Sequence, residues 1–460
     1  MKRNMRYLMM AAALATMTLS SCLFEEEDYF DKTPSKRIEA YNDDLVNLLT
    51  SAEKGWCIQY FPNDTTRGYN IMANFTASGV CHMACSFDRK LVSNADLGDL
   101  KVEYELTDEN PNLYYREDTC LYEIKRQNGP VLAMTSYNTI LSTFVEPAGD
   151  GLGLGGDDHL VLVSVSANEI QLVGERNGGR VYMVPATDEW KNELQARYDD
   201  YQYIFKRGIT TFKMLAGDAA LVCREGNGTG ILQYGQLYTN EAGETSWIGV
   251  ENTPIIVTAN GLRFQKKFVR NDVSADVLNY NENRSALVSA DGKVQIIPEY
   301  EAFLASHDDV WPLDENSLEG DLLTTYQALA DAMKTAGFTG VKIGLGRATA
   351  LPTTGNKVWG LVAYGQRRVG RQTYTFTFVL GYDIDMSQAG RIGMTLETVQ
   401  RDKTYLDNVA ATSGSYRALY EPLNALAKAI EGTYDVTVDD YFVPASATYK
   451  STNISFQVNK

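Results

Sequence analysis

Several residue types are scarce in this 460-residue chain, and each scarcity excludes a class of protein. Cations are few: 42 Lys and Arg stand against 59 Asp and Glu, which gives a net charge of −17. A surface that neutralises nucleic-acid phosphates needs an excess of cations, so we expect no nucleic-acid partner. The three histidines, His82, His159 and His307, are isolated in the sequence, which favours structural positions over catalytic or metal-binding ones.

Long apolar runs are absent except at the amino terminus. Three cations precede the apolar stretch from Leu8 to Leu19, which is too short to cross a bilayer but suits a cleaved signal peptide. Leu19-Ser20-Ser21-Cys22 follows, and small residues before a cysteine are typical of a bacterial lipoprotein signal. We therefore predict that residues 1–21 are removed and that lipid on Cys22 is the membrane attachment; the alternative is a plain secretory peptide.

An acidic tether, residues 22–34, follows the predicted anchor. Glu25, Glu26, Glu27 and Asp28 form four consecutive acids. This run resembles the export signal of Bacteroidetes lipoproteins, in which an acidic cluster after the lipidated cysteine sends the protein to the outer leaflet of the outer membrane. The alternative is a solvated tether that anionic headgroups repel. We expect an outer-membrane protein that faces the cell exterior.

The remaining five cysteines are an odd number, which argues against a disulfide scaffold. They are Cys57, Cys81, Cys85, Cys120 and Cys223. Cys81 and Cys85 lie in a segment that alternates like a strand, so both sulfurs share one face about 13 Å apart, and one zinc ion cannot bridge them. We predict buried thiols; a disulfide with Cys57 or Cys120 is the alternative.

The pattern of apolar residues predicts an α+β, β-rich fold with antiparallel sheets, as barrel or sandwich, and a few flanking amphipathic helices. Short alternating segments separated by Gly, Asn and Asp turns fill the blocks 56–184 and 209–300, and their order in the second block loosely echoes the first. Helices are expected at 34–54, around Trp190 to Tyr198, at 322–333 and at 416–430. The predicted division is a β-rich domain with a leading helix (35–205), a middle β-rich domain (206–310) and a carboxyl-terminal α+β domain (311–460).

Short motifs near the amino terminus give a family resemblance. They are Leu49-Thr50-Ser51-Ala52, Gly55-Trp56, Tyr60-Phe61-Pro62, Gly68-Tyr69-Asn70, Phe75 with Gly79-Val80, Gly129-Pro130-Val131-Leu132, Tyr137-Asn138 and Gly153 to Asp157. With these motifs the chain resembles the Bacteroidetes lipoprotein family catalogued as domain of unknown function 4302, most clearly over residues 22–185. Where members follow Gly-Gly-Asp with an aromatic and an acid, this chain has Asp158-His159-Leu160. The resemblance implies a cell-surface component, often encoded beside SusC- and SusD-like uptake proteins, and assigns no catalytic residue.

The segment from Gly149 to Asp158 is the most unusual stretch because its ten residues include five glycines and three aspartates. It leads into a predicted strand rather than a helix, which excludes a dinucleotide fingerprint. Asp150, Asp157 and Asp158 offer the oxygen ligands that Ca²⁺ takes, so calcium is the one cofactor that the sequence suggests. A ligand-contacting loop and a simple hairpin connection are the alternatives, and we favour the connection.

Aromatic residues are numerous, and packing is the favoured interpretation for most of them. The 28 tyrosines and five tryptophans either form an aromatic binding platform or pack in strands, and the densest cluster is Trp190 with Tyr198, Tyr201 and Tyr203. Zinc-helix, nucleophile-elbow and phosphate-loop motifs are absent from the sequence. We therefore expect a non-enzymatic surface protein that binds a nutrient, glycan or protein partner as an accessory to a SusC/SusD-like uptake system. The alternatives are a carboxylate-dependent hydrolase of glycans or peptides and an adhesin.

Overall fold

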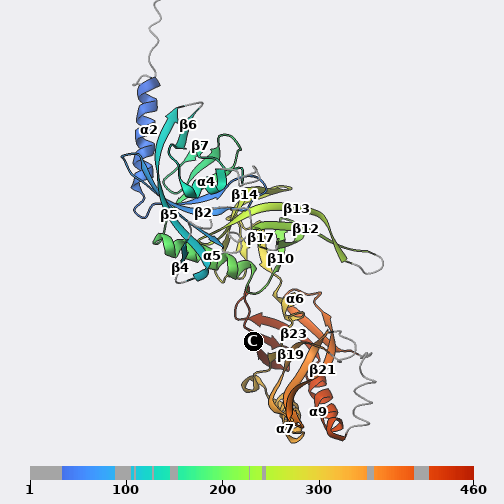
Figure 1. The fold of residues 1–460 in the computed structure, drawn as a ribbon. Coiled ribbons are helices and arrows are strands. Elements are labelled where there is room, and N and C mark those ends of the chain that lie inside the picture. The colour runs from blue at the N-terminus through green and yellow to red at the C-terminus, as the bar shows by residue number, and fades with distance from the viewer. Residues whose placement is uncertain are drawn as a thin grey trace, which may run out of the picture.

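The computed structural model describes residues 34–88, 105–107, 110–126, 129–145, 154–226, 228–240, 245–349, 357–397 and 414–460. Antiparallel sheets dominate these residues and helices lie against them (Figure 1), so the predicted fold class is confirmed. Three sheets follow one another along the chain and lie in the same order from one end of the molecule to the other. Whether each sheet folds as a separate domain stays a prediction.

The first sheet is a ring of antiparallel strands. Its order is β3-β2-β1-β9-β8-β7-β6-β5-β4, and β3 also pairs with β5, so eight strands close on themselves and β4 lies outside the ring. Each ring strand pairs with its neighbours in sequence, which makes an up-and-down arrangement. The strands are β1 (Trp56–Phe61), β2 (Tyr69–Phe75), β3 (Val80–Asp88), β4 (Glu105–Thr107), β5 (Asn110–Arg126), β6 (Pro130–Met134), β7 (His159–Val165), β8 (Ile170–Gly174) and β9 (Arg180–Pro185).

Apolar side chains fill this ring, and helix α4 (Thr139–Val145) packs against them. The Asn138 side-chain oxygen accepts the N–H groups of Ile140 and Leu141, both at 3.0 Å, which caps the start of α4. Phe144 of α4 is fully buried, with its ring centroid 5.1 Å from that of Tyr60. The sequence pattern missed α4 because seven residues are too few to show a helical period.

Helix α2 (Pro34–Ser51) joins the same core from the amino-terminal side. Leu45 and Leu49 lie four residues apart on one helical face and are both buried. The indole N–H of Trp56 donates to the Leu49 carbonyl at 2.9 Å, which ties the helix to β1. The helix predicted after Pro34 is confirmed.

The second sheet is a closed barrel of eight consecutive strands with the same up-and-down connectivity. Its interior is also filled, with Phe212, Phe264 and Leu278 fully buried. The strands are β10 (Thr211–Ala216), β11 (Ala219–Glu225), β12 (Ile231–Thr239), β13 (Thr245–Thr258), β14 (Gly261–Arg270), β15 (Val273–Tyr280), β16 (Leu287–Val288) and β17 (Val294–Pro298).

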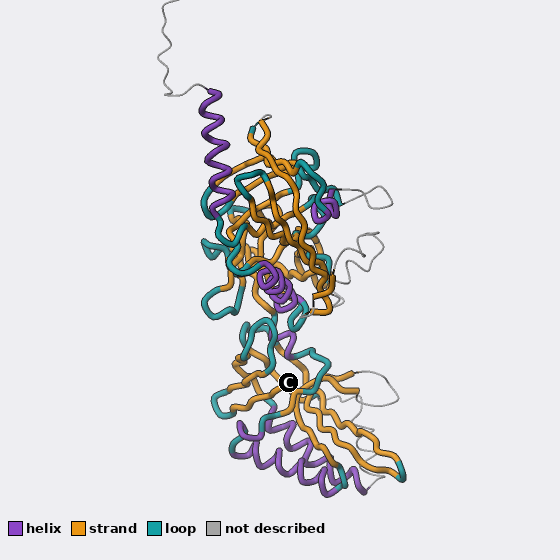
Figure 2. Tube along the Cα trace, turned by 60° about the vertical axis from the view of Figure 1, so that its left-hand side comes forward, coloured by secondary structure: helices purple, strands orange, loops and turns teal. Residues whose placement is uncertain are grey.

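The third sheet has eight strands in sequence order and carries two helices, α7 (Gly320–Thr335) and α9 (Gly414–Ile430), on one face (Figure 2). An isolated bridge between Leu313 and Val458 brings its first and last strands together. The short helices α6 (Tyr300–Leu304) and η3 (Glu315–Ser317) lie before α7 in the chain. The strands are β18 (Trp311–Pro312), β19 (Thr339–Thr349), β20 (Lys357–Val369), β21 (Gln372–Asp385), β22 (Arg391–Leu396), β23 (Gly432–Val438), β24 (Ser446–Lys450) and β25 (Ser455–Asn459).

Direct contacts join the three sheets. Phe61 and Tyr182 of the first ring pack with Ile256 of the barrel, and the Tyr182 hydroxyl donates to the Gln265 carbonyl at 3.0 Å. Phe442, from the loop between β23 and β24, is fully buried in the core of the barrel. The described helices include none that is long and apolar enough to span a membrane.

Candidate functional site

Helix α5 (Trp190–Phe205) crosses the outer face of the first ring. Cys57, Met72 and Ala84 alternate with the interior residues of β1, β2 and β3, so their side chains point outward, and Leu194 of α5 buries them. Trp190 adds to the same cluster. The helix predicted here is confirmed, and it leaves one hollow at its amino end and another beside its carboxyl half.

The start of α5 is fixed by the buried carboxylate of Glu193. It accepts the N–H of Thr187 at 3.2 Å, the hydroxyl of Thr187 at 2.7 Å and the N–H of Asp188 at 3.1 Å. The hydroxyl of Thr187 donates to Glu193 rather than accepting from the helix backbone. Three hydrogen bonds to one charged group hold the loop before α5 in place.

The hollow at the amino end, which we call the α5 groove, has a volume of about 530 Å³. This size lies within the range of small-molecule sites, ~300–1,000 Å³. Its walls come from the turn after α2, from β2 and β5, and from the start of α5. The lining residues are Glu53, Lys54, Asn74, Tyr115, Glu117, Asp188, Glu189, Trp190, Lys191 and Asn192.

Two aromatic rings of the α5 groove are held in position by hydrogen bonds. The Trp190 indole N–H donates to the Lys54 carbonyl at 2.8 Å, and the Tyr115 hydroxyl donates to the Glu117 carboxylate at 2.5 Å. The ammonium of Lys191 lies 5.0 Å from the centroid of the Tyr115 ring. Burial, and then the hydrogen bond to Glu117, raise the pKa of Tyr115, so this hydroxyl stays a donor at neutral pH. The groove thus combines aromatic faces with hydrogen-bonding groups of both kinds.

The carboxylates of the groove favour binding over acid catalysis. Glu53, Glu117, Asp188 and Glu189 are all exposed. A carboxylic acid that protonates a glycosidic oxygen is normally held in a desolvated pocket, because burial raises its pKa. Exposed carboxylates instead accept hydrogen bonds from ligand hydroxyl or amine groups.

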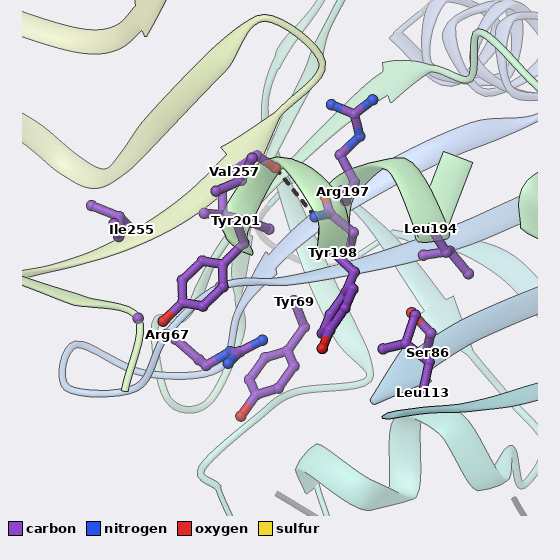
Figure 3. A pocket seen from close by; sticks show the side chains of 14 residues that line it. Arg67, Tyr69, Ser86, Leu113, Leu194, Arg197, Tyr198, Tyr201, Ile255 and Val257 are labelled. Carbon is purple, nitrogen blue, oxygen red and sulfur yellow. Dashed lines mark hydrogen bonds between the residues drawn. The ribbon is translucent and has the colours of Figure 1, made fainter. Parts of the chain in front are cut away.

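The second hollow, the junction pocket, lies where α5, the first ring and the barrel meet (Figure 3). The Arg67 guanidinium lies between two rings, 5.4 Å from the centroid of Tyr69 and 5.6 Å from that of Tyr201. The Asn70 side chain donates to the Val257 carbonyl of the barrel at 3.2 Å. The Asn70 bond joins the first ring to the barrel, and Arg67 joins the ring to α5.

The junction pocket is too small for a nutrient or glycan. Its cavity measures about 60 Å³, room for about two water molecules. The Tyr201 hydroxyl is buried there without a hydrogen-bond partner among the described residues. Burial, followed by the nearby Glu225 carboxylate, raises its pKa, so the hydroxyl is neutral. We therefore assign the pocket to packing and take the α5 groove as the candidate site.

The predicted anchor and export signal, Cys22, Glu25, Glu26, Glu27 and Asp28, lie outside the described residues, and both stay predictions. Asp150 of the predicted calcium loop also lies outside them. The structure gives a local role to Asp157: it is buried, and its carboxylate accepts the N–H groups of Arg176 at 3.2 Å and Asn177 at 2.9 Å. This residue holds the turn between β8 and β9.

Asp158 lines a separate hollow of about 230 Å³ beside α4, together with Tyr137, Asn138 and Ser142. Among the described residues no three His, Cys, Asp or Glu side chains are grouped as a metal site. The calcium hypothesis stays untested, since one of its three aspartates is not described.

The cysteines and the aromatic cluster are placed in different surroundings. Cys57, Cys81, Cys85, Cys120 and Cys223 are all buried as thiols, and His82 is exposed on the opposite face of β3 from Cys81, as the alternation predicts. Of the aromatic cluster, Trp190 lines the groove, Tyr198 and Tyr201 line the junction pocket, and Tyr203 packs on Phe442. Sequence reasoning missed Tyr115, Glu117 and Lys191, since only the fold brings β5 next to α5.

Comparison with known proteins identifies a family. The family model described as "Domain of unknown function (DUF4302)" matches residues 26–282, more than half of the chain, and confirms the resemblance. The match covers the whole first ring and the barrel as far as β15. No curated protein matches the chain. Among solved structures, Caulobacter crescentus pol III beta aligns over 90% of this chain and 95% of that chain with 9% identity, at a TM-score of 0.12, too low to indicate a shared fold.

Proposed function

The chain belongs to the DUF4302 family, and from the geometry of its α5 groove we propose that it is a non-enzymatic, lipid-anchored surface protein that binds glycans. The observation that carries the proposal is the groove itself, in which Trp190 and Tyr115 are held beside exposed carboxylate, amide and ammonium groups. Aromatic faces stack on sugar rings, and these polar groups match sugar hydroxyls.

The filled interiors of both β-rings support a surface site. Eight-stranded up-and-down barrels are just wide enough either to hold one small ligand or to be packed with side chains. Here the interiors hold fully buried residues such as Phe75 and Phe264. A ligand must therefore bind on the outside, where the α5 groove is the largest hollow described above.

The charge of the α5 groove selects among sugars. Four acids face two lysines, Lys54 and Lys191. The surplus of negative charge disfavours acidic ligands, so neutral or amino sugars are the expected class.

The membrane attachment is part of the proposal and has its own test. Eleven residues separate Cys22 from Pro34, which allows a reach of at most about 40 Å between the lipid and α2. We expect Cys22→Ala to move the protein from the outer-membrane fraction into the soluble fraction. Retention in the membrane would show that the anchor assignment is wrong. Cross-linking on intact cells followed by mass spectrometry tests the SusC/SusD-like partner.

Binding is tested by calorimetric titration of the intact protein with a panel of neutral oligosaccharides. Trp190→Ala is expected to raise the Kd at least tenfold, which corresponds to ~1.4 kcal/mol, while Trp247→Ala, a half-buried tryptophan on the barrel, leaves it unchanged. Glu117→Gln keeps the shape of the groove and is expected to weaken binding several-fold. Equal Kd values for the wild type and both groove variants would refute the site, and turnover of the oligosaccharides would favour the hydrolase alternative.

A further inference from the structure

The chain contains one long segment without acids. Between Ala332 and Tyr382 there is no Asp or Glu, although acids make up 59 of 460 residues in the whole chain, about one in eight. The same segment carries seven cations: Lys334, Lys342, Arg347, Lys357, Arg367, Arg368 and Arg371. A strongly acidic protein thus holds a local region of positive charge.

This region lies mainly on the β19–β20–β21 part of the third sheet. Strands β20 and β21 form a long hairpin whose pairing runs from Gly360 with Gly381 to Val369 with Gln372. The hairpin belongs to the third sheet, at the end of the molecule opposite α2 (Figures 1 and 2). Arg367, Arg368 and Arg371 gather at its tip, which we call the basic tip.

The arginines of the basic tip have no acidic partner among the described residues. Arg367 lies over the Phe338 ring, 5.8 Å from its centroid, and Arg368 donates to the Gly370 carbonyl at 3.2 Å. Arg368 and Arg371 are exposed. Elsewhere in the chain, exposed arginines such as Arg391 pair with a carboxylate, in that case Asp435 at 2.5 Å. Guanidinium groups without an acidic partner remain available to a bound anion.

Hydroxyl groups follow the basic tip along one face of the sheet. Arg368 pairs with Thr373, Gln366 with Thr375, and Tyr364 with Thr377, so these side chains share the face opposite α7 and α9. Lys342 of β19 pairs with Tyr364 and adds a cation to this face. From Tyr364 to Arg368 the strip is about 13 Å long.

We infer that the basic tip and its hydroxyl strip bind an anionic glycan, whose carboxylate or sulfate groups pair with Arg368 and the turn residue Arg371 while its hydroxyls bond the Thr and Gln side chains; Arg367, on the opposite face over Phe338, adds positive charge at the tip. The site is separate from the α5 groove and takes the opposite charge class. Salt largely screens the interaction between exposed charges that are farther apart than the Debye length, which is about 8 Å at physiological ionic strength. The acids of the other two sheets therefore do not cancel the charge of the tip.

The test is titration of the intact protein with a heparin-derived dodecasaccharide and with an oligogalacturonate at 50 mM NaCl. The triple variant Arg367→Gln, Arg368→Gln, Arg371→Gln is expected to lose at least tenfold in affinity. The control variant removes three exposed barrel cations, Lys213→Gln, Lys267→Gln and Lys293→Gln, and is expected to bind within twofold of the wild type. Binding should also weaken steadily as NaCl is raised to 500 mM.

Three results would overturn the inference: absence of binding at 50 mM NaCl, equal losses in both triple variants, or tighter binding of a single-stranded DNA of matched charge. A concentration-dependent dimer that the tip variant abolishes would assign the surface to a second copy instead. Matching thermal unfolding midpoints exclude misfolding, and the single variant Arg371→Gln supplies a milder change. Because Trp190→Ala should leave heparin binding intact, failure here is distinguishable from failure of the α5 groove.

Discussion

Phe442 belongs by sequence to the third sheet but is buried in the core of the barrel, and its removal should destabilise the barrel. Its ring centroid lies 5.5 Å from that of Tyr203, 5.6 Å from Tyr280 and 6.3 Å from Phe212. The side chain is fully buried. Replacing a buried Phe with Ala costs about 3–5 kcal/mol, from lost burial and the cavity left behind.

The loop that carries Phe442 is fixed by further contacts. Asp440 accepts the N–H groups of Phe442 and Val443, both at 2.8 Å, and also the hydroxyl of Tyr203 at 2.8 Å. A Cβ at Gly208 would lie 2.2 Å from the Phe442 carbonyl oxygen, so the helix α5 connection approaches the loop closely enough to require glycine. The loop is therefore held in one position, so the core of the barrel cannot easily collapse into the cavity that removal of the Phe442 ring would leave.

The assay is hydrogen exchange measured by mass spectrometry on the full chain. Phe442→Ala is expected to raise exchange in β10, β15 and β17 of the barrel. Phe456→Ala is the matched control, because Phe456 is equally buried within the core of the third sheet and should raise exchange in β23–β25 instead. Faster exchange confined to the third sheet in Phe442→Ala would refute the reasoning that the two sheets share a core.

Three further predictions concern single residues. His307 stacks on Trp311 with 4.8 Å between ring centroids, and burial lowers the pKa of His307 to about 4. Because the unfolded chain binds more protons between pH 4 and 6.5, the free energy of unfolding should fall by roughly 3 kcal/mol as the pH drops through that window. Denaturant titrations of His307→Gln should show a smaller dependence of stability on pH. Cys57, Cys81, Cys85, Cys120 and Cys223 are all buried, so Ellman's reagent should react with these five thiols only after denaturation, and rapid native labelling would contradict their burial; for Cys57, burial also raises the pKa to about 12. Asp157→Ala removes the acceptor of two backbone N–H groups and should lower the unfolding free energy by about 3 kcal/mol, whereas an unchanged urea midpoint would mean that the turn is held by other contacts.

The parts of the fold that could be predicted are those with a repeating local pattern. Alternation along β3 correctly placed Cys81 and Cys85 on one face, where both are buried, and the helical period located α2, α5, α7 and α9. The closure of the first ring could not be predicted, because it depends on the long-range pairing of β3 with β5. Helix α4 was missed because it is short and is selected by burial of Phe144 rather than by its period.

The candidate site was harder to predict because its residues come from distant segments. Tyr115 and Lys191 are 76 positions apart in the sequence, yet the ammonium of one lies over the ring of the other. Trp190 was singled out as an aromatic residue, but not as part of a groove. Asp157 was singled out because a Gly-Asp run is typical of a ligand loop. The residue is instead buried, and its carboxylate accepts backbone N–H groups of a turn.

Net charge is an average over the whole chain, and one segment departs from it. The net charge of −17, averaged over the chain, argues against polyanionic partners. In salt, however, a bound anion interacts mainly with the charges that lie within about one Debye length of it. Residues 332–382 contribute +7, so the rest of the chain carries −24, and this acid-free basic segment is separated from the acids of the chain. Separation of this kind gives a sharp expectation: the tip variant should lose heparin binding, and the control variant, which changes the net charge by the same amount, should not. If the average governed binding, the two variants would behave alike.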